Sequence, residues 1–278
     1  MTNNIKIIPC SNAIGAYIEG VQLNEKLQQK TINIIYDAFL KYQVIFFRNQ
    51  HLTEIEYLSF ARKIGKPIMY PFVKGLQKYP EITPILKKET DLNNFGGIWH
   101  SDTSYLKKPP KGTMLYAIEV PENGGDTEFA NQYLAYDHLS KDMKIFLDNK
   151  KALNISGKEE TTKTRSDLRK HSSTQIKSNE HEAEHPVVRT HPETKRKSLY
   201  INIAHTNCFT DMSIEESTPI LNLLFKHQIK FDFIYRFKWE KGSVAIWDNR
   251  CTLHNPINDY YGKRRLMHRI TFEGDTPI

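Results

Sequence analysis

The sequence has few cysteines and no long apolar run, and these absences exclude several classes of protein. Only three cysteines occur among 278 residues, at Cys10, Cys208 and Cys251. An odd number of widely spaced cysteines argues against a disulfide framework and is typical of a reducing cytoplasm. No apolar run approaches the roughly 20 residues that span a bilayer, and residues 1–6 contain no basic region leading into an apolar stretch. We therefore expect a cytoplasmic protein with neither a membrane segment nor a signal peptide.

The sequence also lacks a concentrated basic region. Its formal net charge of +7 at pH 7 would attract nucleic acid or small anions. The lysines and arginines are spread along the chain, however, and no basic helix or aromatic-interleaved basic stripe occurs. We therefore expect no nucleic-acid partner. A generic basic surface and a protein that handles small anions both remain consistent with this charge.

Hydrophobic spacing and capping patterns predict a mixture of helices and strands. Thr53 followed by Glu56, and Ser213 followed by Glu216, are capping-box patterns that open helices. Helices are predicted at about 24–41, 53–64, 133–149 and 213–227, and strands at about 5–8, 44–47, 113–120, 127–130, 186–189, 198–203, 231–239, 243–247 and 266–272. Without repeats or a linker, this pattern predicts one α+β domain over 1–278, built around a β-sandwich or barrel.

The segment 158–184 differs from the rest of the chain in composition. It is crowded with Lys, Glu, Thr, Ser, Arg and His, and has almost no large apolar residue. Such a segment buries too little apolar surface to offset the entropy lost on ordering. We therefore predict a solvated loop or a mobile active-site lid, with His171 and His181 exposed to solvent.

Two distant stretches of sequence contain the residues of a metal site. His100 and Asp102 are two residues apart, and such residues share one face of a strand. His254 would supply a third ligand from a distant strand. Two histidines and one carboxylate on one face of a metal are the ligand set of non-haem Fe(II) oxygenases. Zinc binds the same ligands, so a zinc hydrolase remains an alternative.

Two arginines near the end of the chain suggest a carboxylate ligand. Arg265 and Arg269 are four residues apart, so they face the same side of a strand, and the guanidinium fork suits carboxylates. A solvated basic edge is the alternative. Against it, Leu266, Met267 and Ile270 surround these positions, so at least one arginine should face an apolar interior. An unpaired charge is costly there, and a bound dicarboxylate would relieve the cost.

With these residues, the chain resembles the taurine/2,4-D dioxygenase family of Fe(II)- and 2-oxoglutarate-dependent oxygenases. The similarity covers nearly the whole chain, and the matching stretches are 99–105, 123–127, 185–192, 247–254, 258–260 and 264–270. The resemblance implies a double-stranded β-helix, or jelly roll, with flanking helices. It also implies Fe(II) ligands at His100, Asp102 and His254, and 2-oxoglutarate-binding residues at Thr127, Arg265 and Arg269.

The resemblance further implies that the chain hydroxylates a small, anionic organic molecule with O2 as co-substrate, releasing succinate and CO2. Candidate substrates are a sulfonate, a sulfate ester, and an aryloxy or other carboxylate. Asp102 favours a hydroxylase, because related halogenases lack this carboxylate, whereas desaturation stays open. A non-catalytic sensor that binds 2-oxoglutarate or metal is the alternative from another class. The resemblance also favours a homo-dimer or homo-tetramer.

The residues expected to line the substrate pocket come from several stretches. The candidates are Tyr70, Asn94, Phe95, Tyr105, His205 and Arg269. Two departures from the taurine-enzyme pattern argue against taurine as substrate. Pro67 stands where those enzymes typically have His, and Gly96 where they have Asn. Both departures remove polar groups that would contact an amino-sulfonate.

Overall fold

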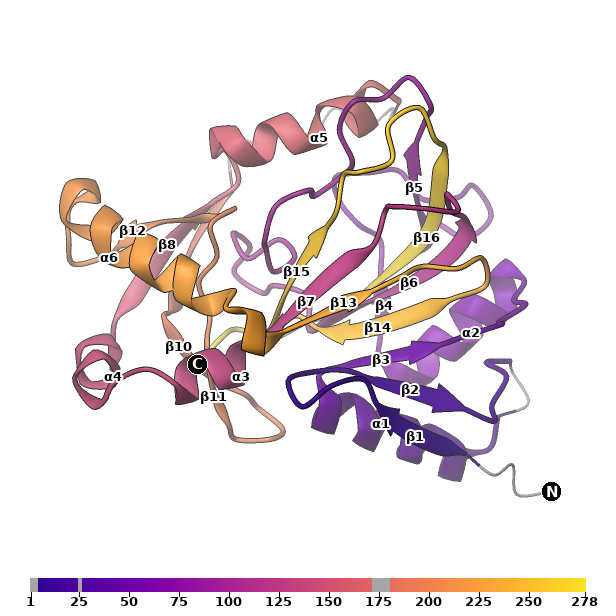
Figure 1. Cartoon of the computed structure of the whole chain (residues 1–278), viewed down its shortest axis with the longest axis horizontal. Coiled ribbons are helices and arrows are strands. Elements are labelled where there is room, and N and C mark those ends of the chain that lie inside the picture. The colour runs from indigo at the N-terminus through magenta and orange to yellow at the C-terminus, as the bar shows by residue number, and fades with distance from the viewer. Residues whose placement is uncertain (1–4, 25–26, 172–180) are drawn as a thin grey trace.

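The chain folds into β-sheets flanked by helices (Figure 1). The computed structural model describes residues 5–24, 27–171 and 181–278. The largest sheet has eight strands in the order β1-β2-β3-β14-β6-β16-β4, with β5 also paired to β16. These strands are β1 Lys6–Pro9, β2 Ala16–Glu19, β3 Val44–Phe47, β4 Pro67–Ile68, β5 Thr83–Lys87, β6 Gly112–Glu119, β14 Val244–Asp248 and β16 Arg265–Phe272.

A three-stranded sheet packs against one face of the large sheet. Its order is β13-β7-β15, with bounds β13 Ile234–Phe237, β7 Thr127–Asn131 and β15 Thr252–Pro256. Phe129 and Phe237 of this sheet pack with Phe46 and Met267 of the large one, and the Phe46 and Phe237 rings stack with centroids 4.0 Å apart. The candidate site lies between these two sheets, because inward side chains of β15 and β16 meet there.

Helices α1 (Gln29–Tyr42) and α2 (Glu54–Ile64) cover the other face of the large sheet (Figure 1). Ile35 and Phe39 of α1 and Phe60 of α2 belong to one buried cluster with Ile45 and Ile246 of the sheet. The capping box predicted at Thr53 is confirmed. Helix α1 begins at Gln29, which is later than the predicted start at residue 24.

The smaller elements lie to one side of the two packed sheets (Figure 1). They are β8 Lys151–Ile155, β9 Glu182–Pro186 and β12 Thr206–Phe209 in one sheet, β10 Val188–Thr190 and β11 Lys197–Leu199 in another, and helix α6 Ile214–Gln228. The capping box predicted at Ser213 is confirmed. The predicted strand 198–203 ends early because Asn202 caps a turn, accepting a hydrogen bond from the backbone N–H of His205 at 3.0 Å.

The helix predicted over 133–149 is wrong as a single element. The structure has α3 (Gln132–Asp137) and α4 (Lys141–Leu147) in its place. The break arises because Ser140 caps a new helix, and its hydroxyl accepts a hydrogen bond from the Met143 backbone N–H at 3.2 Å. Similarly, the strand predicted over 231–239 begins with the 3-10 turn Phe231–Phe233 and is regular only in β13.

The prediction of a loop over 158–184 is wrong for most of the residues that the structure describes. Helix α5 (Glu159–His171) occupies the first part and β9 begins at Glu182, whereas residues 172–180 and the side chain of His171 lie outside the described part. Tertiary contacts hold this polar helix. Asp167 accepts hydrogen bonds from the backbone N–H groups of Leu92 and Asn93, at 3.0 and 2.8 Å. Composition alone therefore underestimated its order.

Within the described ranges, no helix is both long enough and apolar enough to cross a membrane.

Candidate active site

Three candidate metal-ligand side chains converge between the two packed sheets. His254 lies on β15, and His100 forms an isolated bridge to it through two backbone hydrogen bonds of 3.0 and 2.9 Å. Asp102 Oδ1 is 3.7 Å from His100 Nε2 and 3.8 Å from His254 Nε2. Neighbouring ligands that each lie about 2.1 Å from one ion are roughly 3–3.4 Å apart, so small side-chain rotations would bring these three atoms onto a single ion. All three residues are buried, and their potential ligand atoms lie within 4.8 Å of one another.

The stretch that holds His100 and Asp102 is not the regular strand predicted from the sequence. Only His100 forms a bridge, and the chain then enters a turn in which Thr103 has a φ of 44°. This turn brings Asp102 Oδ1 to 3.7 Å from His100 Nε2. The convergence of the two side chains is therefore as predicted, although the local backbone differs.

A hydrogen bond for His100, and burial for His254, favour the neutral form that can bind a metal. His100 Nδ1 lies 2.7 Å from the Ile98 carbonyl oxygen, so Nδ1 bears the proton and the lone pair of Nε2 faces Asp102. Burial, and next the neighbouring His100, hold the pKa of His254 well below its ordinary value. A neutral imidazole is the form that binds a divalent metal.

The Asp102 carboxylate is oriented by neighbours on its far oxygen. Oδ2 accepts hydrogen bonds from Thr113 Oγ1 at 2.6 Å and from Asn249 Nδ2 at 3.2 Å, which leaves Oδ1 facing the histidines. Asn249 is itself held by Trp247, whose Nε1 donates to Asn249 Oδ1 at 2.9 Å. Burial would raise the pKa of Asp102, but Arg269 and the two histidines outweigh it and hold that pKa well below its usual range. The donor set therefore fits a divalent metal.

Replacing Asn249 by alanine is expected to weaken metal binding about 10- to 100-fold, because the Asp102 carboxylate loses a hydrogen bond that orients it. Isothermal titration of the purified variant with Mn(II) or Co(II) measures this effect. Asn255→Ala is the matched control, since Asn255 follows His254 but its side chain hydrogen-bonds Glu128 at 3.4 Å. Equal affinities of the Asn249 variant and the wild type would remove this role.

A cavity leads from the three ligands to two buried arginines. Its lining includes the metal-ligand residues together with Thr127, Arg265 and Arg269, and the apolar Ile85, Phe95, Leu115, Trp247 and Pro256. Arg265 is 6% exposed, and its Nε and Nη2 have no hydrogen-bond partner among the described residues. Thr127 Oγ1 accepts a hydrogen bond from Trp239 Nε1 at 2.9 Å, so its own hydroxyl proton is available to a ligand.

Arg269 lies at the other end of the cavity, next to the metal ligands. Its Nη2 is 2.9 Å from Asp102 Oδ1, and its guanidinium carbon is 4.5 Å from the centroid of the Tyr70 ring. The prediction that Arg265 and Arg269 point to the same side of a strand is confirmed by the strand register and by their shared cavity. The two positive charges therefore flank the space beside the triad.

Aromatic side chains form a wall next to the metal ligands. The Tyr105 ring lies 4.9 Å from the His205 ring, which is 6.4 Å from that of His100. Phe72 joins them, with its ring 5.7 Å from Tyr105 and 5.6 Å from His181. The prediction that His181 is exposed is wrong, because it is half-buried against these rings. Phe72 and His181 were not among the predicted pocket residues, since their sequence positions give no sign that they meet Tyr105.

Asn94 and Phe95 occupy different positions relative to this cavity. Phe95 is part of its lining. Asn94 is buried nearby and donates from Nδ2 to the Pro256 carbonyl oxygen at 3.0 Å, so its amide is engaged in holding the loop to β15. The glycine at 96 is required by packing, because a Cβ there would lie 2.9 Å from the His100 ring.

A second buried group, His191, Asp248 and Cys251, has metal-ligand residue types but is a hydrogen-bonded network. His191 Nδ1 accepts from the backbone N–H of Thr194 at 3.0 Å, so Nε2 bears the proton and donates to Asp248 Oδ2 at 3.0 Å. Arg250 donates to both oxygens of the same carboxylate, at 2.8 and 2.7 Å. Burial raises the pKa of the Cys251 thiol, which stays protonated. No lone pair is left for a metal.

Replacing Asp248 by asparagine is expected to destabilise the fold by about 3 kcal/mol near pH 7, because Arg250 loses its buried carboxylate partner. Burial alone would raise the pKa of Asp248, but Arg250 and then His191 hold it below its ordinary value. The wild-type carboxylate therefore stabilises the fold above the unfolded-state pKa near 4, and this contribution is lost as pH falls through the lower folded-state pKa.

Urea unfolding from about pH 3 to pH 7 measures the effect of this substitution. The variant should lose less stability than the wild type as the solution is acidified, because it has no carboxylate to protonate. Asp211→Asn serves as the control, since Asp211 is exposed and pairs only with Lys150 at the surface. Wild-type stability of the Asp248 variant at neutral pH would contradict the assignment.

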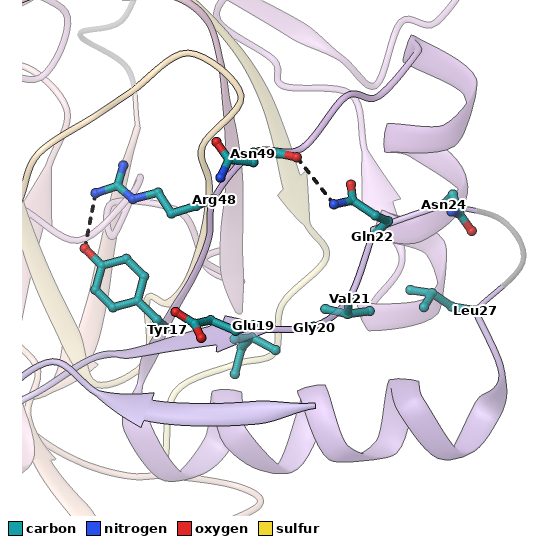
Figure 2. Close-up of a pocket in the computed structure, with 10 residues that line it drawn as sticks. Tyr17, Glu19, Gly20, Val21, Gln22, Asn24, Leu27, Arg48 and Asn49 are labelled. Carbon is teal, nitrogen blue, oxygen red and sulfur yellow. Dashed lines mark hydrogen bonds between the residues drawn. The ribbon is translucent and has the colours of Figure 1, made fainter. Parts of the chain in front are cut away.

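A larger cavity of about 530 Å³ lies away from the triad, along β2 and the loop after it (Figure 2). The positive charge of Arg48 in its lining is already engaged. Arg48 donates to the Tyr17 hydroxyl at 3.2 Å and to Ser243 Oγ at 2.7 Å, and its guanidinium lies 4.4 Å from the Phe237 ring centroid. This cavity is larger than the one beside the triad, but the residues of its lining do not bring metal-binding or carboxylate-binding groups together. The site between the sheets is therefore the better candidate for the active site.

Comparison with known proteins identifies the family. The sequence model described as "Taurine catabolism dioxygenase TauD, TfdA family" matches residues 6–271. The chain is 32% identical to an alkylsulfatase of Acinetobacter baylyi, covering 99% of this chain and 86% of that protein. It is 30% identical to an alpha-ketoglutarate-dependent sulfate ester dioxygenase of Pseudomonas putida, with 99% and 91% covered.

A solved structure agrees with the sequence comparison. The crystal structure of a putative alpha-ketoglutarate-dependent taurine dioxygenase from Burkholderia xenovorans superposes with a TM-score of 0.84 at 32% identity, covering 99% of this chain and 94% of that one. The family uses Fe(II), 2-oxoglutarate and O2, which fits the His-Asp-His set described above. The chain belongs to the taurine catabolism dioxygenase TauD, TfdA family and is a 2-oxoglutarate-dependent non-haem iron dioxygenase.

Proposed function

We propose that His100, Asp102 and His254 hold the iron of this dioxygenase. The most direct support is that the Nε2 atoms of both histidines face the same oxygen of Asp102, at 3.7 and 3.8 Å. When bound, iron and 2-oxoglutarate supply the oxidising chemistry, with succinate and CO2 released. The polypeptide orients the two reactants, excludes water and supplies the charges that hold the anions.

We propose that the distal carboxylate of 2-oxoglutarate binds Arg265 and Thr127. Arg265 has free donors on Nε and Nη2 among the described residues, and a buried guanidinium without an anion is costly. Trp239 engages the Thr127 oxygen as acceptor, which turns the hydroxyl proton toward the cavity. A planar guanidinium and a hydroxyl together match the two oxygens of a carboxylate.

The substrate is proposed to be a small organic anion that carries an apolar group. Arg269 lies beside the metal ligands and supplies the positive charge, and Tyr70 holds its guanidinium. Ile85, Phe95 and Leu115 line the cavity and supply apolar surface on which an alkyl or aryl group can pack. Tyr105 and His205 are fully buried and lie outside this lining. A sulfate ester, a sulfonate, or an aryloxy or other carboxylate combines these features. Relatives that act on sulfate esters and on 2,4-dichlorophenoxyacetate support this range.

Taurine itself is a poor match for this pocket. Gly96 offers no polar side chain, and a Cβ at this position would lie 2.9 Å from the His100 ring on a backbone with a φ of +79°, so adding one would require the surroundings to shift. Pro67, in β4, likewise has no polar side-chain group to offer. An amino-sulfonate would therefore find no polar group from these two positions for its ammonium.

Succinate release from a panel of substrates tests the proposed function. The panel contains alkyl sulfates, alkylsulfonates, aryloxyacetates and taurine, each with Fe(II), 2-oxoglutarate and O2. We expect succinate to form fastest with an apolar sulfate ester or aryloxy acid, and to form slowly with taurine. No succinate above the substrate-free rate with any anion would contradict the proposal and favour a non-catalytic sensor.

We also propose a jelly-roll core, formed by the large sheet and the β13-β7-β15 sheet that enclose the site. Homo-dimers or homo-tetramers are proposed from the family resemblance, without a nucleic-acid or membrane partner. A cytoplasmic location is proposed because Cys10, Cys208 and Cys251 are all free thiols.

A further inference from the structure

Lys87, the last residue of β5, is a buried lysine outside the proposed iron and 2-oxoglutarate ligand set. It is 4% exposed, and its Nζ has no hydrogen-bond partner among the residues that the structure describes. The ammonium lies 4.7 Å from the centroid of the Tyr260 ring. Burying an ammonium group without an acceptor costs free energy of folding, so packing alone does not explain a lysine at this position.

The strand register places Lys87 next to the co-substrate arginine. Strands β5 and β16 are antiparallel neighbours (Figure 1), and their register places Lys87 directly opposite Arg265. Side chains at directly opposite positions share a face, with Cβ atoms about 4.5–5.5 Å apart. Ile85, two residues earlier on the same face of β5, lines the cavity that contains Arg265 and the metal ligands. Lys87 is not itself part of that lining, but its position opposite Arg265 places it next to the Arg265 end of the cavity.

Two like charges at opposite positions of a sheet repel each other, and here no carboxylate separates them. Within the described part of the chain, no carboxylate hydrogen-bonds Arg265 Nε or Nη2 or Lys87 Nζ, although the Tyr260 side chain interacts with Arg265. Asp126 acts on Arg265 only at a distance, since its carboxylate accepts a hydrogen bond of 2.8 Å from Arg236 at the surface. A pair of buried cations of this kind is favourable only when an anion lies beside them.

Tyr260 packs between Lys87 and the turn at Gly125, close to Arg265. Its ring faces Lys87, and both the ring and Arg265 pack over Gly125, where a Cβ would lie 3.3 Å from the ring and 3.5 Å from Arg265 Cδ. Gly125 has a φ of +73°, so the turn before β7 and the absence of a side chain bring these groups together. The lysine ammonium is thus held by the ring at the same end of the cavity as Arg265.

We propose that Lys87 is a second cationic binding residue for the distal carboxylate of 2-oxoglutarate, acting beside Arg265. This inference rests on the proposed function, because it requires the co-substrate carboxylate to lie at Arg265. The ammonium adds positive charge that a single guanidinium and the Thr127 hydroxyl do not supply. A lysine that only packs on Tyr260 is the alternative, and it predicts no dependence on the charge of the ligand.

The test compares two 2-oxo acids that differ at their far end. The Mn(II)-loaded protein is titrated calorimetrically with 2-oxoglutarate and with 2-oxopentanoate, which has a methyl group in place of the distal carboxylate. We expect Lys87→Met to raise the Kd for 2-oxoglutarate about tenfold, because one charge-assisted contact is lost. The Kd for 2-oxopentanoate should be unchanged. Lys87→Arg should restore 2-oxoglutarate binding to within about threefold of the wild type.

Lys88→Met is the matched control, since Lys88 follows Lys87 in the sequence but lies beyond the end of β5 and is only half-buried. Binding of 2-oxoglutarate should be unchanged in this variant. A Kd of the Lys87→Met protein equal to that of the wild type would overturn the inference, and so would an equal loss of affinity for both acids. If the wild-type protein itself does not bind 2-oxoglutarate, the proposed function fails first, and this outcome is separate from the other two.

Discussion

Replacing Asp102 by alanine is expected to lower succinate formation by at least about a thousandfold while the fold is retained. Asp102 supplies the oxygen that both histidines face, at 3.7 and 3.8 Å, so its loss opens the facial set. A bound metal contributes several kcal/mol to transition-state stabilisation, and each 1.4 kcal/mol is about tenfold in rate. His100→Ala should have a similar effect, because it removes one of the two imidazoles. Succinate assays and metal titration on the same samples measure both losses.

The retained fold needs its own check, because Asp102 also pairs with Arg269. Circular dichroism and urea unfolding should show a folded variant, although Arg269 loses its partner at 2.9 Å. Asp102→Asn keeps a side chain of the same shape that can still accept from Thr113, so it separates loss of the charge from loss of packing. Asp211→Ala, an exposed carboxylate paired with Lys150, is the control for a missing aspartate. Turnover near the wild-type rate in the folded Asp102→Ala variant would refute the ligand assignment.

Replacing Arg265 by alanine is expected to raise the KM for 2-oxoglutarate about a hundredfold, with a smaller change in kcat. Removing one partner of a buried, hydrogen-bonded charge pair costs about 2–5 kcal/mol, and 2.8 kcal/mol corresponds to about a hundredfold. The guanidinium lies at the distal end of the cavity, away from the reacting atoms, so the loss should appear mainly in binding. Initial rates at varied 2-oxoglutarate and saturating substrate measure it.

Arg264→Ala is the matched control for this prediction. Arg264 precedes Arg265 in the sequence but points outward, where its Nε donates to Glu119 at 3.1 Å. Its loss should leave the KM for 2-oxoglutarate near the wild-type value. An unchanged KM in the Arg265 variant would instead remove that residue from the co-substrate site, whatever the Arg264 variant shows.

The convergence of the three proposed ligands could be predicted from the sequence, because it depends on residue types and spacing. His100 and Asp102 are two residues apart and His254 lies in a second stretch, and the structure brings the three together. Arg265 and Arg269 could be placed on one face of a strand for the same reason. Capping boxes at Thr53 and Ser213 were equally local signals, and both are present.

The supporting residues could not be predicted, because their contacts join distant parts of the chain. Asn249 hydrogen-bonds Asp102, which lies 147 positions earlier in the sequence, and no local sequence pattern at either residue predicts that contact. The sequence does not distinguish Lys87 from the other lysines. Only the register of β5 and β16 places it opposite Arg265. Helix α5 has the composition of a loop, and the contact of Asp167 with the backbone at Leu92 is part of what orders it.

Anaerobic titration of the Fe(II)-loaded protein with 2-oxoglutarate tests the central claim most directly. A 2-oxo acid that binds ferrous iron through its keto and carboxylate oxygens gives a weak visible absorption band. We expect the band to appear and saturate with the wild-type protein, and to require far higher 2-oxoglutarate with Arg265→Ala. If iron is bound and no band appears at any 2-oxoglutarate concentration, the co-substrate does not bind at this metal and the account is contradicted.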